Sequence, residues 1–96
     1  MKFLEAYHKL KEMEDWKFSI SFYYHDEDSE PMLIIESDVE RITLDHSDDF
    51  GFIISIFTKE NLISFTQNNW LAFTGGEYIT FGSANENGIH WIIEFC

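Results

Sequence analysis

The chain has 96 residues, of which 18 are acidic and 6 basic, so its formal charge at pH 7 is −12. Hydrophobic residues make up 45% of the chain and aromatic residues 18%, which excludes a disordered acidic tail, because such tails lack apolar surface to offset the entropy of ordering. We expect a single folded domain over residues 1–96, with no room for a second.

The chain has one cysteine, Cys96, so an intrachain disulfide is excluded and a reducing compartment is indicated. An acid at Glu5 interrupts the position where a secretory signal needs its apolar core, and no apolar run approaches the ~18 residues of a membrane span. We therefore expect a cytoplasmic protein. Its negative field would repel lipid headgroups and nucleic-acid phosphates and would attract a basic protein.

Apolar residues recur at three-and-four spacing near the start of the chain, at Phe3, Leu4, Tyr7, Leu10 and Met13. This spacing predicts an amphipathic helix over residues 2–14. From Trp16 to Tyr24 the apolar residues alternate instead with polar ones, which predicts a strand with one buried face.

The next segment is acidic. Residues 25–30 contain no apolar side chain and predict a loop, which leads into a short strand over residues 32–35. Residues 36–38 indicate a turn, because unbroken alternation would place their carboxylates on the same face as Ile42 and Leu44. A third strand is then expected over residues 40–44.

The remaining chain predicts further strands separated by turn clusters rich in Asn, Gly and Ser. One alternative stays open, since Thr58 could cap a short helix within residues 58–70. The expected fold is α+β, an N-terminal amphipathic helix packed on an antiparallel β-meander of about seven strands. The later strands are expected at residues 50–58, 62–66, 70–74, 78–81 and 89–95.

Motifs for catalysis or metal binding are weak. None of the four histidines has a recognised ligand spacing, and no nucleophile motif occurs. Gly75 and Gly76 fit a hairpin turn better than a phosphate-binding loop. We therefore expect no catalytic residue, no metal ligand and no cofactor. A small metal-dependent enzyme is the third-ranked alternative, because His46 lies close to Asp48 and Asp49.

Negative charge is concentrated in the first half of the chain. Residues 26–49 contain ten acidic residues and one base, Arg41, for a net charge of −9. If the turn at Ser37 is correct, the loops around residues 26–30 and 45–49 emerge at the same end of the sheet and form one acidic rim. A solvated surface without a partner is the alternative. The candidate partner-binding acids are Asp26, Glu27, Asp28, Glu30, Asp45, Asp48 and Asp49.

Aromatic residues provide a second group of candidates. Tyr23, Trp70 and Tyr78 are expected to be partly exposed, because each lies out of phase with the buried face of a strand or beside a polar turn, and such residues anchor protein interfaces. The aromatics expected in the core include Trp16, Phe18, Phe22, Phe50, Phe52, Phe57 and Phe95.

In its size, acidic segment and aromatic-rich sheet, the chain resembles the small acidic immunity proteins that bacteria pair with nuclease toxins, including those of contact-dependent growth inhibition and colicin systems. The resemblance implies a cytoplasmic inhibitor that forms a one-to-one complex with a basic nuclease toxin and covers its active-site or substrate-binding face. The second-ranked alternative is a phage-type nucleic-acid mimic that blocks restriction or CRISPR enzymes.

Overall fold

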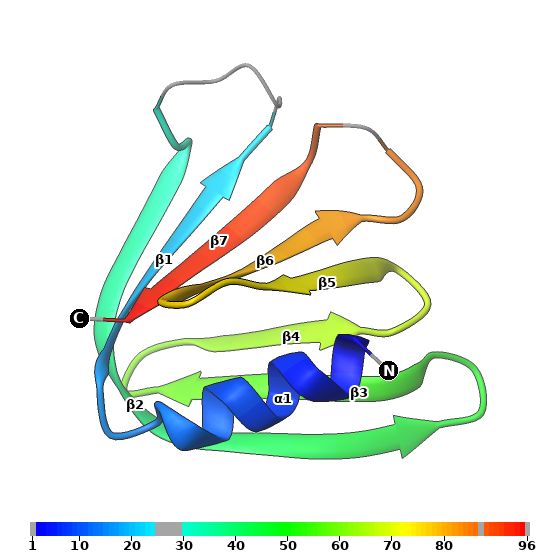
Figure 1. Cartoon of the computed structure of the whole chain (residues 1–96), viewed down its shortest axis with the longest axis horizontal. Helices are drawn as coiled ribbons and strands as arrows, with labels where there is room; N and C mark the ends of the chain where they lie inside the picture. Colours follow the sequence, from blue (N-terminus) through cyan, green and yellow to red (C-terminus); the bar gives the residue numbers. More distant parts are fainter. Residues whose placement is uncertain (1, 25–29, 87, 96) are drawn as a thin grey trace.

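The computed structural model describes residues 2–24, 30–86 and 88–95. One N-terminal helix packs on a seven-stranded antiparallel sheet that curls into a half-barrel (Figure 1), which confirms the predicted α+β fold. The strand at residues 62–66 is also confirmed, against the helical alternative. The elements are α1 (Lys2–Glu12), β1 (Lys17–Tyr23), β2 (Leu33–Ser47), β3 (Gly51–Thr58), β4 (Leu62–Thr66), β5 (Trp70–Thr74), β6 (Tyr78–Ser83) and β7 (His90–Phe95).

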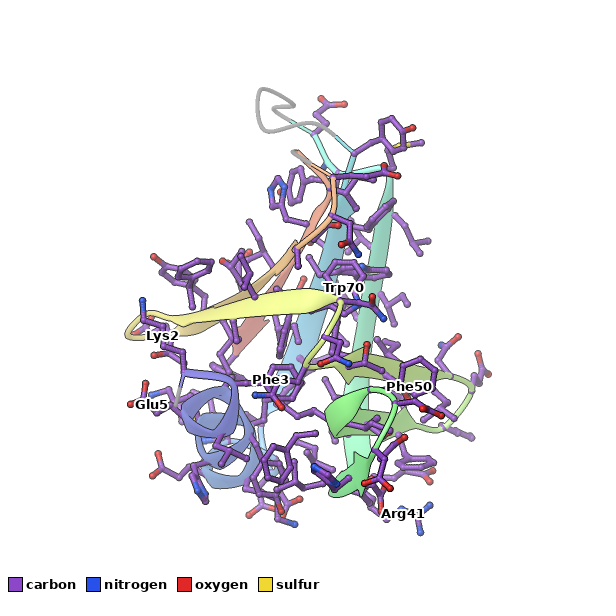
Figure 2. All side chains as sticks on the ribbon, turned by 90° about the vertical axis from the view of Figure 1, so that its right-hand side faces the viewer. Lys2, Phe3, Glu5, Arg41, Phe50 and Trp70 are labelled. Carbon is purple, nitrogen blue, oxygen red and sulfur yellow. The ribbon has the colours of Figure 1, made fainter. Side chains whose placement is uncertain are left out.

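Helix α1 buries one face, formed by Phe3, Ala6 and Leu10, and packs mainly against β5. Phe3 points into the interior of the half-barrel, whereas Glu5 points away from it (Figure 2). An acid in the first turn and lysines in the last turn both suit the helix dipole. Among the described residues, no helix has the length and apolar character needed to cross a membrane.

The sheet has the strand order β4-β3-β2-β1-β7-β6-β5, so β4 and β5 are its two edges although they are consecutive in the chain. Curling brings the two halves of the sheet together across a shared core. Phe65 of β4 stacks on Phe81 of β6 with ring centroids 4.0 Å apart, and Phe3 meets Phe81 edge-on at 6.1 Å. The helix and both halves of the sheet therefore share one aromatic core.

The predicted turn at residues 36–38 is wrong, because β2 runs through them as one strand of 15 residues. Its pairing with β3 shifts register between Val39 and Arg41, which leaves Glu40 as the extra residue of a β-bulge. Before the bulge Ile35 and Val39 pack on the core, and after it Ile42 does so. The bulge changes the phase of the alternation by one residue, so the carboxylates of β2 face outward without a turn.

Strand β2 belongs to both halves of the sheet. Its residues 33–38 pair with β1, whereas residues 39–47 pair with β3. As a result, residues 30–32, which precede β2, and the turn after β2 lie at opposite ends of a long, bent strand (Figure 1).

Two predictions of core aromatics are wrong. Trp16 is 50% exposed because β1 begins one residue later, and Phe50 is 47% exposed because it lies in the turn before β3. Of the others, Phe18 and Phe95 are buried, and Phe22, Phe52 and Phe57 are half-buried.

Candidate protein-binding surface

Those of the proposed acids that the structure describes do not form a single rim. Asp26, Glu27 and Asp28 lie outside the described residues. Glu30 is exposed just before β2 begins, whereas Asp45, Asp48 and Asp49 are exposed where β2 ends. The predicted rim required a turn at Ser37 that folded β2 back on itself, and the continuous strand instead separates Glu30 from the acids at its far end.

Asp48 and Asp49 belong to the turn after β2, which is held by hydrogen bonds between the backbone of Asp49 and two polar side chains. Asp49 N donates a hydrogen bond to Ser47 Oγ at 3.2 Å, and Asn68 Nδ2 donates to the carbonyl oxygen of Asp49 at 2.6 Å. These bonds tie the β2–β3 turn to the β4–β5 turn and leave the carboxylate groups out of the network.

The three candidate aromatics are also separated. Tyr23 is half-buried near the end of β1, where its ring stacks on His90 with centroids 4.9 Å apart. Tyr78 is 48% exposed at the opposite end of the sheet, at the start of β6. Trp70 meets Phe65 edge-on at 5.5 Å and is packed against the core, which leaves it half-buried.

An exposed apolar segment was missed in the sequence. Met32, Leu33 and Ile34 are 67%, 47% and 53% exposed at the start of β2. The sequence predicted a short strand over residues 32–35, and a run of four apolar residues is typical of a buried strand, so nothing in the sequence indicated this exposure. Only the strand order reveals that this part of β2 pairs on one side alone, with β1.

Carboxylates accompany these apolar side chains. Residues 30–40 contain four acids, Glu30, Glu36, Asp38 and Glu40, and no base. Glu36 lies beside Ser19 of β1, which lies in turn beside Glu94 of β7, so these two carboxylates are about 10 Å apart on the outer face of the sheet. We call residues 32–34, 36 and 38 the β2 edge surface.

A hollow of about 450 Å³ lies along this surface. One wall is formed by residues 34–37 of β2, and the other by Lys59, Glu60 and Asn61 of the β3–β4 turn. The β2 edge surface therefore borders an open space, where no strand is paired with it.

The carboxylates of β2 take part in no ion pair within the described ranges, where the single ion pair joins Lys11 to Glu14 at 3.2 Å. Arg41, the base nearest in sequence, lies with its Cζ 4.1 Å from the centroid of the Phe57 ring. No group of three metal-ligating side chains occurs in the described part of the chain. Lys59, the one base on the walls of the hollow, lies next to Glu60. The surface therefore offers carboxylates that form no ion pair beside exposed apolar groups, a combination suited to binding a basic protein.

No protein-family model matches this chain, and no curated protein or solved structure is significantly similar to it.

Proposed function

We propose that this protein binds and inhibits a basic protein through the β2 edge surface. One observation carries the proposal: exposed apolar side chains and unpaired carboxylates share the same segment of β2. Exposed apolar groups favour burial against a partner, and the adjacent negative charge selects a basic one.

A nuclease toxin is the partner class that we favour. Nucleases hold substrate phosphates with Lys and Arg, and those same side chains would pair with Glu36, Asp38 and their neighbours. The chain would then act as an immunity protein, blocking the basic substrate-binding face in a one-to-one complex.

The two kinds of side chain would contribute at different steps of binding. The field of a chain with net charge −12 accelerates encounter with a basic partner, most strongly at low ionic strength. Met32 and Ile34, once buried against the partner, would slow dissociation, because apolar contacts at the centre of an interface mainly set residence time.

A nucleic-acid mimic is the second candidate. It is favoured by Glu36 and Asp38, which lie two residues apart on one strand, at about 6.6 Å spacing, rather than in a loop. A mimic would compete with nucleic acid for several unrelated binders, whereas an immunity protein would bind one toxin.

The proposal is tested with the product of the reading frame adjacent to this chain's gene. We expect that product to be a basic nuclease, to form a one-to-one complex with the chain, and to lose activity on binding. The double substitution Glu36→Gln and Asp38→Asn should slow association about tenfold at low ionic strength, with a smaller effect at high salt.

The matched control is Asp48→Asn with Asp49→Asn, which removes the same charge from the far end of β2. Association should change much less in this control. If the adjacent product does not bind, or if both double variants slow association equally, the proposed surface is wrong.

A further inference from the structure

The first part of β2 is an uncovered sheet edge. Residues 33–38 pair with β1, and pairing with β3 begins only at Val39, after the strand bends. In Figure 1 this part of β2 forms the outer margin of the sheet, and none of the described helices and strands lies beyond it.

The strand pairing shows which backbone groups of this edge are unpaired. Hydrogen bonding alternates along antiparallel strands, so each residue bonds to only one of its two neighbouring strands. Ser83 N donates to the Ile89 carbonyl at 2.9 Å, which identifies the β7 residues that bond to β6. The β7 residues that do not bond to β6 bond to β1, and the β1 residues that do not bond to β7 bond to β2. With the observed registers, residues 33, 35 and 37 of β2 are the ones that bond to β1. The N–H and C=O groups of Ile34 and Glu36 therefore point away from the sheet.

The apolar part of this edge, residues 32–35, has no charged side chain of its own, although Pro31 precedes it and Glu36, Asp38 and the bulge at Glu40 follow it. Natural edges are shielded by charged side chains, prolines, bulges or a covering element. Here residues 32–35 are all apolar, three of them are about half exposed or more, and the hollow beside them is open. The edge has both the backbone groups and the apolar side chains that an added strand would need.

Charge decides between the possible occupants. A second copy of this chain would bring another net charge of −12 and place its own four acids of residues 30–40 near those of the first. A basic segment would instead meet Glu36 and Asp38 with opposite charge.

We infer that the basic partner adds an extended strand to the free edge of β2, hydrogen-bonded to Ile34 and Glu36. This inference rests on the proposed function and specifies how the partner is recognised. Alternate side chains of the added strand would lie next to Leu33 and Ile35 on the inner face and next to Glu36 on the outer face. The segment that fits therefore alternates apolar residues with Lys or Arg.

The inference is tested with a seven-residue peptide in which Lys and Val alternate, added to ¹⁵N-labelled protein. The amides of Ile34 and Glu36 should exchange with solvent about tenfold more slowly in the complex, whereas those of Leu33 and Ile35 should change little, because they are already bonded to β1. A peptide of alternating Glu and Val should give no protection. The Lys and Val peptide methylated at its alternate backbone nitrogens should also give none, because it cannot donate to the edge.

The matched variants are Ile34→Lys and Leu62→Lys, which place the same charge at exposed apolar positions on β2 and on the edge strand β4. Ile34→Lys should weaken peptide binding about tenfold, and Leu62→Lys should leave it unchanged. Circular dichroism of both variants checks that each is folded.

Unchanged exchange at Ile34 and Glu36 with saturating peptide would overturn the inference, as would a dimer of the protein alone that Ile34→Lys dissociates. The proposed function fails separately. If the adjacent gene product binds and depends on Glu36 and Asp38 but leaves both amides unprotected, strand addition is wrong and the inhibitor proposal stands.

Discussion

At the scale of single residues, Gly51 lies where the β2–β3 turn contacts the β4–β5 turn, two segments that are far apart in the sequence. Its φ is +75°, in the left-handed region that side chains with a Cβ rarely adopt. A Cβ at this position would lie 2.7 Å from Gln67 Oε1, which accepts a hydrogen bond from Phe52 N at 3.1 Å. Glycine here lets the start of β3 approach the β4–β5 turn, which helps the half-barrel to close.

Gly51→Ala should lower the free energy of unfolding by about 2 kcal/mol, from the left-handed backbone and from displacement of Gln67. Urea denaturation of the purified variant measures this change. Gly76→Ala is the control, because its added Cβ meets no atom within 4 Å and its φ is not positive; its effect should stay within about 0.5 kcal/mol. Equal losses in the two variants would contradict the argument for Gly51.

At the scale of elements, periodicity predicted most of the fold. The three-and-four spacing of α1 and the alternation of β1 each belong to an element with one buried face, so their signals are local and were confirmed. The sequence predicted two strands where the structure has β2 alone. The bulge inserts one residue into a pattern of period two, and the broken pattern resembles a turn.

The candidate site could be predicted only in part, for the same reason. The acidic composition of the segment was visible in the sequence, but which acids share a surface depends on whether β2 folds back or continues. The apolar residues 32–35 look the same in sequence whether their strand is central or at an edge. Strand order is set by contacts between distant segments, here of β1 with β7, which no local pattern reveals.

Inserting one alanine between Ser37 and Asp38 should abolish the native fold. The bulge at Glu40 places Ile35 and Ile42, which are seven residues apart, on the same face, so one further residue would turn Ile35 outward. We expect the insertion variant to lose its near-ultraviolet circular dichroism and its cooperative thermal transition. Deleting Glu40 removes only the extra residue and keeps Ile35 and Ile42 on one face, so this control should still fold. An insertion variant that folds, or a deletion variant that does not, would contradict this account of the bulge.

At the scale of the whole molecule, attractive electrostatics are sparse. The net charge is −12, and one ion pair, Lys11 with Glu14, occurs in the part of the chain that the structure describes. That pair lies on the surface, where its contribution is at most about 1 kcal/mol. Repulsion among carboxylates therefore outweighs attraction in the folded state, and the aromatic core around Phe65 and Phe81 offsets it.

Added salt should consequently stabilise the protein. At physiological ionic strength, salt screens charges over about 8 Å, which is shorter than the roughly 10 Å between Glu36 and Glu94 across β1. Added salt therefore weakens the repulsion between such carboxylates and leaves the apolar core unchanged. We expect the midpoint of thermal unfolding to rise by several degrees between low and physiological sodium chloride. The variant with Glu36→Gln and Asp38→Asn should begin with a higher midpoint and show a smaller rise, because two of the repelling charges are gone. The expectation is contradicted if the midpoint falls with salt, or if the two substitutions leave its dependence on salt unchanged. Either result would mean that the acids of β2 do not destabilise the free protein. Their concentration on this edge would then have no energetic cost for a partner to relieve.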